Sequence, residues 1–160
     1  MGRVYSAQFS AVATTVVLDF FELIAPADAV VKIHEIRITQ STEAGDAQSE
    51  QLIFQIKRAS GAYTSGSAGT TPTPTPLNFG DPAFGGTVEA NNTTQAAAGS
   101  GALATLLSAS DNVHNGFHYL PTPETQIIIS PSQALVVSLG AAPADSITFD
   151  GYIVFEEIGG

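Results

Sequence analysis

The sequence predicts an all-β domain, a jelly-roll or Greek-key β-sandwich of about eight or nine strands. Three observations predict it. Apolar and polar residues alternate with a period of two along most of the chain. Glycine and proline turn signals separate short apolar runs, and no long segment has the 3.6-residue period of a helix. Long connections beside short ones favour a jelly roll over an up-and-down barrel.

The first half of the chain contains four expected strands. The first belongs to an N-terminal strand or arm, 1–13, and the second stops where Pro26 removes a ladder donor. In the third, the apolar parity changes around His34-Glu35, which predicts a β-bulge or a strand that crosses between sheets. These four strands are expected at 5–11, 16–23, 30–40 and 52–57.

A long connection is expected at residues 59–85, which are rich in Gly, Ser, Thr and Pro. Three successive Thr-Pro pairs place prolines at positions 72, 74 and 76. Each proline fixes its φ angle and lacks a backbone donor, so we expect extended polyproline II backbone on the surface.

The second half contains five further expected strands. Between the first two, Ala96 to Ala109 is the one stretch where a helical turn or two is expected, although Gly99 and Gly101 argue against a long helix. Residues 131–133 predict a hairpin turn between two short apolar strands. The five strands are expected at 88–94, 113–120, 126–130, 134–139 and 147–155.

The length and composition predict a single domain spanning residues 1–160. Charged residues make up only 12%, about half the usual share, so the surface must carry many small neutral polar groups. There is no cysteine, which excludes disulfides, thiolate metal sites and cysteine nucleophiles. No apolar run approaches the roughly 18 residues of a membrane span.

The charge balance is strongly acidic, with 5 Lys and Arg against 15 Asp and Glu and a net charge of −10. Acidic groups cannot neutralise phosphates, so neither nucleic acid nor an anionic membrane surface is an expected partner.

Three runs place apolar residues on successive positions, at 16–18, 127–129 and 135–137. A lone two-layer sandwich needs only one apolar face per strand. The outer faces are therefore covered either by the chain's own 59–85 segment or by another subunit, and we expect a homo-oligomer.

No constellation of residues predicts catalysis or cofactor binding. His114 and His118 are spaced H-x-x-x-H, but on a strand this separation is about 13 Å, too far for one ion. Glu43, Asp46 and Glu50 offer oxygen ligands for calcium, although a solvated acidic turn is the preferred interpretation. No nucleophile elbow or phosphate loop occurs. We expect no enzyme, no cofactor and no metal; a hydrolase that uses either histidine with a nearby acid is a third hypothesis.

Large apolar side chains beside flexible or strand-edge backbone are the candidate interface residues, because such residues often anchor association. Phe9 and Phe117 could equally be ordinary core residues, which for Phe9 is the preferred interpretation. The candidates are Tyr5, Phe9, Pro72, Pro74, Pro76, Phe79, Phe117 and Tyr119.

Five stretches resemble small virion-associated proteins of tailed bacteriophages: YSAQFSAVATT, VLDFFELIAPADAVVKIHEIRITQS, EANNTT, FHYLPTPE and DGYIVFEEIG. The resemblance implies a jelly-roll protein of the virion, assembled in the host cytoplasm. It implies in particular a head decoration protein that trimerises on the major capsid protein shell. A head fibre, neck or tail component would have a similar sequence.

The leading hypothesis is therefore a trimeric decoration protein that binds and stabilises the outer surface of the capsid lattice. The alternative is a carbohydrate-binding, lectin-like module of a head fibre or tail component, since jelly rolls also serve as lectins. Aromatic rings for stacking on sugars would come from Tyr63, Phe79, Phe84, Phe117 or Tyr119.

Overall fold

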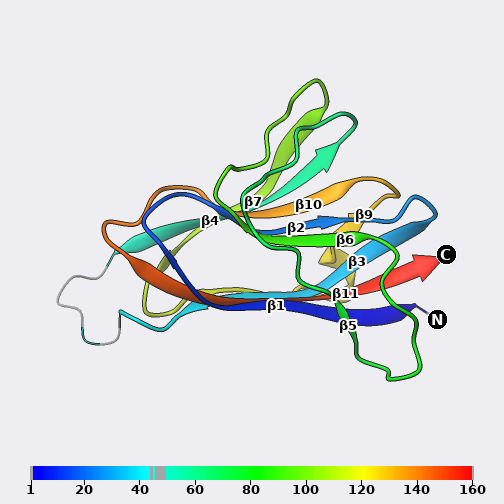
Figure 1. The fold of residues 1–160 in the computed structure, drawn as a ribbon, viewed down its shortest axis with the longest axis horizontal. Helices are drawn as coiled ribbons and strands as arrows, with labels where there is room; N and C mark the ends of the chain where they lie inside the picture. Colours follow the sequence, from blue (N-terminus) through cyan, green and yellow to red (C-terminus); the bar gives the residue numbers. More distant parts are fainter. Residues whose placement is uncertain (1, 44, 46–49, 160) are drawn as a thin grey trace.

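The computed structural model describes residues 2–43, 45 and 50–159, and it is a sandwich of two antiparallel sheets, as predicted (Figure 1). One sheet, here called the β1 sheet, contains β5 (Thr75–Pro76), β1 (Arg3–Thr14), β11 (Ile147–Gly159), β3 (Ala29–Gln40), β8 (Phe117–Tyr119) and β9 (Ile128–Ile129). The other, the β2 sheet, contains β6 (Thr87–Asn92), β2 (Asp19–Ile24), β10 (Ala134–Leu139), β4 (Gln51–Ser60) and β7 (Ala102–Asn112). A single 3-10 turn, η1, covers Pro123–Thr125.

The strand order is that of a jelly roll. The chain is doubled back on itself, so that β1 pairs with β11, β2 with β10, β3 with β8 and β9, and β4 with β7. Most successive strands therefore alternate between the two sheets, the exceptions being β6 with β7 and β8 with β9, and long connections lie at the ends of the sandwich. No helix within the described residues is long and apolar enough to cross a membrane.

Aromatic rings fill the space between the sheets. Phe20 is fully buried, and its ring centroid lies 5.0 Å from that of Phe149, 5.9 Å from Phe54 and 6.1 Å from Phe9. Such ring pairs add to the free energy gained by burying their area. This cluster joins strands from both sheets and forms the centre of the core.

Two bulges adjust the β1 sheet. The pairing of β3 with β11 shifts register at His34, so the change in apolar parity there reflects a bulge, the first of the two predicted alternatives. A second shift lies in β1 between Phe9 and Val12, and Ala11 there has a φ of 54°. The extra residue lets β1 keep its apolar side chains on the core face before and after the bulge.

Two expectations from the sequence were wrong. The stretch from Ala96 to Ala109 has no helical turn and instead leads into β7, which pairs with β4 along its whole length. Residues 131–133 do not close a hairpin, because β9 belongs to the β1 sheet and β10 to the β2 sheet. In both cases long-range pairing overrode a local signal.

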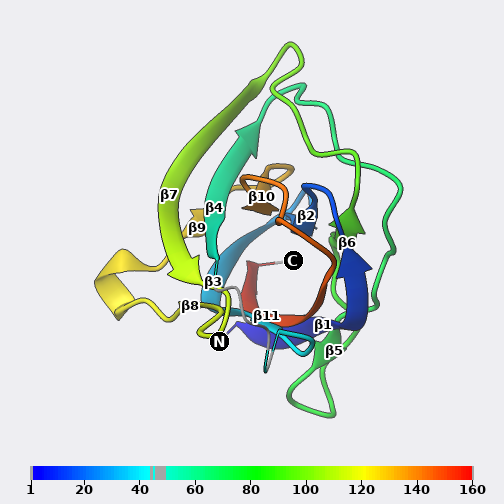
Figure 2. The same ribbon diagram turned by 90° about the vertical axis from the view of Figure 1, so that its left-hand side faces the viewer.

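The 59–85 connection runs across the open side of the sandwich (Figure 2). Its first part is bridged to the segment around β6, at Thr64 with Ala97, at Ser67 with Thr94 and at Thr70 with Ala90. The Thr-Pro repeat then reaches the other sheet, where β5 pairs with β1. The connection is thus paired with both sheets.

The chain's own segments cover the outer face of β10. Ala134 and Val136 are completely buried there, in a small cluster with Ala59 and Ala96, and Tyr63 packs against it. The two-sided apolar run 135–137 is therefore explained by intramolecular coverage, the first of the two alternatives. In the other two runs, Val16 and Ile128 remain 47% and 57% exposed.

Candidate functional site

The outer face of the β1 sheet carries a row of polar side chains from neighbouring strands. Gln8 of β1 lies opposite Tyr152 of β11, which lies opposite Arg37 of β3. His118 of β8 continues the row beyond Arg37. The register of four strands, none adjacent in sequence, brings these residues together.

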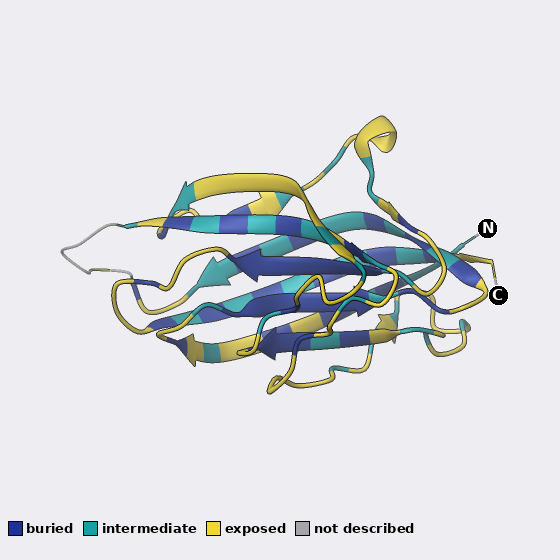
Figure 3. Ribbon diagram, turned by 90° about the horizontal axis from the view of Figure 1, so that it is seen from above, coloured by how far each residue is buried: buried dark blue, intermediate teal, exposed yellow. Residues whose placement is uncertain are grey.

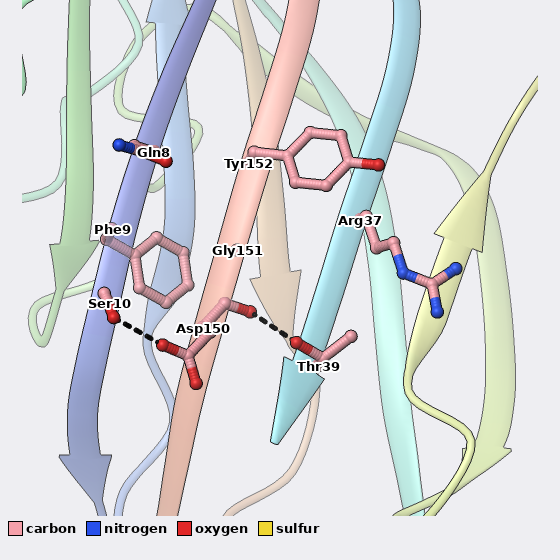
Figure 4. Close-up of a pocket in the computed structure, with 8 residues that line it drawn as sticks. All are labelled: Gln8, Phe9, Ser10, Arg37, Thr39, Asp150, Gly151 and Tyr152. Atoms are coloured by element: carbon pink, nitrogen blue, oxygen red, sulfur yellow. Dashed lines mark hydrogen bonds between the residues drawn. The ribbon is translucent and has the colours of Figure 1, made fainter. Parts of the chain in front are cut away.

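A shallow hollow of about 200 Å³ opens beside this row. Figure 4 shows the Phe9 ring between β1 and β11 at Gly151. A Cβ atom on Gly151 would come within 2.7 Å of Phe9 Cε1, so the glycine lets the ring pack against the strand. The hollow is lined by Gln8, Phe9, Ser10, Arg37, Thr39, Asp150, Gly151 and Tyr152.

Asp150 is the fixed acidic group of the hollow. The Ser10 hydroxyl donates to its Oδ1 atom at 2.6 Å, and the Ala11 N–H donates to the same atom at 3.0 Å. These hydrogen bonds, the one from Ser10 first, hold the pKa of Asp150 below its ordinary value. The bulge in β1 places both donors beside the Asp150 carboxylate. Because its pKa is lowered, this carboxylate stays ionised at neutral pH.

Glu35 lies at the centre of a second polar group. Its Oε1 atom accepts a hydrogen bond from the Tyr152 hydroxyl at 2.6 Å and lies 2.9 Å from His118 Nε2. The bond from Tyr152 is the main cause that lowers the pKa of Glu35, and the same bond raises the pKa of Tyr152. The phenol is thereby held across the sheet face beside the hollow.

Chemically, the hollow offers a carboxylate, an amide, a guanidinium, three hydroxyls and two aromatic rings. These groups can hydrogen-bond to a polar ligand, but the hollow is open to solvent and holds no histidine. In the described part of the chain, no group of three His, Cys, Asp or Glu side chains could hold a metal ion.

Three of the predicted interface residues are buried. Tyr5 is 0% exposed, Phe9 9% and Phe117 8%. Phe9 and Phe117 belong to the central core. For Phe9, a core position was the preferred interpretation of the sequence. The Tyr5 hydroxyl donates to the Pro82 carbonyl at 3.0 Å, and its ring packs on Phe84. Tyr5 therefore holds the end of the long connection, at Pro82 and Phe84, against the β1 sheet.

The remaining predicted interface residues differ in exposure. Pro72, Pro74 and Pro76 are half-buried, with exposed threonines between them. Tyr119 is half-buried, and its hydroxyl donates to the Thr125 carbonyl at 3.1 Å. Phe79 alone is completely exposed.

Phe79 lies on a projecting loop, residues 77–81, that follows β5 and extends beside the N-terminus (Figure 1). Leu77 on the same loop is 61% exposed, and its N–H donates to the Val4 carbonyl at 2.8 Å. Asn78 donates to Asp81 across the turn at 3.0 Å. The loop and residues 2–4 line an open hollow of about 450 Å³.

The weaker metal candidates are dispersed. His114 lies in the turn between β7 and β8, while His118 is within β8 next to Glu35. Glu50 accepts a hydrogen bond from the Ala144 N–H at 3.0 Å, and Glu43 is buried. Asp46, the third member of the proposed calcium turn, lies outside the described residues.

Two buried carboxylates on the outer face of β2 were not anticipated from the sequence. Glu22 is 0% exposed and accepts hydrogen bonds from the Tyr63 and Ser65 hydroxyls, both at 2.7 Å. Asp19 is 1% exposed and accepts from the Ala96 N–H at 2.6 Å. Burial raises the pKa of Asp19, against the hydrogen bonds that favour its charged form. These two side chains attach the covering segments to the sheet.

The aromatic residues expected to stack on sugars do not form one platform. Tyr63 donates to Glu22, Phe84 packs on Tyr5 and Phe155, and Phe117 is in the core. The aromatic residues that line the polar hollow are Phe9 and Tyr152 instead. In the sequence, the alternating polar positions of β1, β3 and β11 were the available signal for this polar hollow. Only the strand register, however, shows that these positions lie side by side.

Comparison of the chain with protein-family models, with curated proteins and with solved structures finds no match.

Proposed function

We propose that the chain is a structural subunit of a tailed-phage virion, a capsid decoration protein that binds the outer surface of the major capsid lattice as a homo-oligomer. The observation that carries the proposal is Phe79. Its side chain is wholly exposed on a loop whose base is fastened to β1 through Leu77 and Tyr5. An exposed aromatic ring on a firmly held loop is suited to anchoring in a pocket of a partner protein.

The charge and the polar chemistry are consistent with this role. A net charge of −10 keeps the subunit soluble and away from packaged DNA. The resemblance to small virion proteins supplies the particular setting, and the trimer that it implies stays a prediction. Capsid stabilisation would come from bridging neighbouring capsid subunits with several such loops in one oligomer.

A binding assay with Phe79→Ala tests the proposal. Purified chain is mixed with capsids of its phage prepared without it, and co-sedimentation is measured. Because Phe79 has no packing to lose, the variant should unfold at the wild-type midpoint but bind at least about tenfold more weakly. Leu120→Ala is the matched control, since Leu120 is 67% exposed on a different loop. Wild-type protein that fails to bind, or an unimpaired Phe79→Ala, would reject the role.

The second candidate is a carbohydrate-binding module, and the polar hollow on the β1 sheet favours it. Asp150 and Gln8 can hydrogen-bond to sugar hydroxyls, and the Tyr152 ring provides an apolar surface. A glycan array probed with wild-type protein and with Tyr152→Ala tests this function. Binding that disappears in the variant supports it, and an array without signal removes it.

A further inference from the structure

The outer face of the β1 sheet is accessible to ligands. Apart from the bulge at His34, β3 and β11 alternate between buried and partly exposed residues, and this alternation is visible along the strands in Figure 3. Every second side chain of these strands therefore reaches the outer face. On the β2 sheet, by contrast, the chain's own segments cover the outer face of β10. The polar row from Gln8 to His118 lies on the accessible face.

Arg37 provides a positive charge in this row that the protein does not neutralise by direct pairing. None of the ion pairs among the described residues involves Arg37. Glu35, on the same strand, instead accepts a hydrogen bond from Tyr152 and lies 2.9 Å from His118 Nε2. A guanidinium with free donors can hold a carboxylate through two parallel hydrogen bonds. Arg37 is thus available to a carboxylate of a ligand.

The other polar groups of the row lie on the opposite side of Tyr152. Figure 4 shows Gln8 and Asp150 on one side of the Tyr152 ring and the Arg37 guanidinium on the other. Gln8 is on β1 and Arg37 on β3, with β11 between them. Two strand spacings amount to about 10 Å, which is longer than a single sugar ring. A ligand that reaches both ends must therefore extend across the strands.

We propose that this row binds an acidic oligosaccharide of at least two residues, lying across β1, β11 and β3, with its carboxylate on Arg37. Hydroxyls of the neighbouring sugar bond to Gln8 and Asp150, and a ring face packs on Tyr152. The groups are held before binding, because Glu35 fixes the Tyr152 hydroxyl and the Ser10 hydroxyl donates to Asp150. Such preorganisation lowers the entropy lost on binding.

The charge of the chain limits the ligand to few carboxylates. Asp150 and Glu35 lie on the same face, and the net charge of −10 repels a polyanion. A short glycan with one carboxylate is affected less, since distant charges are screened beyond about 8 Å at physiological salt. The inference rests on the second candidate function, carbohydrate binding, and names its ligand class.

A glycan array tests the ligand class when each acidic glycan is printed beside its carboxyl-reduced derivative. We expect signal from acidic glycans that falls at least about tenfold on reduction, because the charge-assisted bonds to Arg37 are lost. The strongest acidic glycan and its reduced derivative are then titrated by calorimetry against the wild-type chain and its variants.

Arg37→Gln should weaken binding of the acidic glycan about tenfold or more and leave the reduced derivative unchanged, whereas a purely structural effect would weaken both. Lys32→Gln is the matched control: it removes the same charge from the same strand, five residues away, and should bind as the wild type does. Gln8→Ala should weaken both glycans alike. Unchanged circular dichroism shows that the variants fold.

Three results would overturn the inference: a reduced derivative that binds as tightly as the acidic glycan, an unimpaired Arg37→Gln, or a glutamate peptide that binds as tightly as the glycan. The outcomes are separable. Binding to neutral glycans alone rejects the acidic ligand and keeps the carbohydrate-binding function, whereas an array without any signal rejects both.

Discussion

Replacing Glu22 by leucine should release the first part of the long connection from the β2 sheet. The carboxylate is fully buried, and it accepts hydrogen bonds from Tyr63, Ser65 and the Gly66 N–H, the last at 2.9 Å. Asn92 is a fourth donor, at 3.4 Å. Leucine has a similar volume but no acceptor, so the perturbation removes the acceptor and keeps the packing.

The expected loss in the free energy of unfolding is estimated from the hydrogen bonds that each donor loses. The Gly66 N–H is buried, and leaving it unpaired costs about 1–3 kcal/mol. The Tyr63 and Ser65 hydroxyls can turn to water, but they lose charge-assisted bonds of about 1.5–3 kcal/mol each. Relief of the buried charge offsets part of this loss. We expect a net decrease of about 2–4 kcal/mol in the free energy of unfolding, or roughly 4–16 °C in Tm.

Urea unfolding and hydrogen exchange measure the effect. Glu22→Gln is a graded comparison, because its amide oxygen can accept from Gly66 while its NH₂ donates to the two hydroxyl oxygens; its cost should be about 1 kcal/mol. Glu89→Gln is the matched control, since Glu89 is the half-buried cross-strand partner of Glu22. It should cost less than about 1 kcal/mol. In Glu22→Leu, exchange at the Gly66 amide should accelerate before global unfolding.

The reasoning would be refuted if Glu22→Leu cost less than about 1 kcal/mol, or if the leucine and glutamine variants were equally stable. Either result would mean that the covering segment is held by apolar packing alone.

Gly151→Ala should lower the free energy of unfolding by about 1–3 kcal/mol, because the added Cβ meets Phe9 Cε1 at 2.7 Å and Ile38 Cδ1 at 2.8 Å. Gly80→Ala, where nothing lies within 4 Å, serves as the control in the same urea titration; equal midpoints for the two variants would contradict the packing argument. Tyr152→Phe should flatten the acid dependence of stability. The lowered pKa of Glu35 contributes stability above its ordinary pKa of 4.5, and this stability is lost as pH falls through the folded-state value. Unfolding titrations from about pH 6 to about pH 3 should therefore show a shallower slope in the variant, and an unchanged slope would exclude Tyr152 as the cause.

Much of the fold could be predicted, because period-two alternation and turn residues are local signals. The bulge at His34 was one of two predicted alternatives, because a parity change is visible within one strand but does not separate a bulge from a crossing between sheets. The pairing of β7 was missed, since the strand is rich in small residues, is mostly exposed and has little apolar alternation. The crossing after β9 was missed because a turn does not reveal which sheet the next strand joins.

Less of the candidate site than of the fold could be predicted from the sequence. Phe79 was among the candidates, but nothing in the sequence separated it from Tyr5, which supports the same loop from inside. The polar hollow depends on the register of β1, β11 and β3, which a single sequence does not specify. Glu22 resembled an ordinary surface carboxylate, because the segment that buries it lies about forty residues away in sequence.

The central claim is that this chain is an assembly subunit of a virion. Quantitative mass spectrometry of gradient-purified particles tests it most directly, by measuring the number of copies of this chain relative to the major capsid protein. The account predicts a fixed ratio that persists through repeated purification. Absence of the chain from the particles, or a ratio that falls with each purification step, would contradict it.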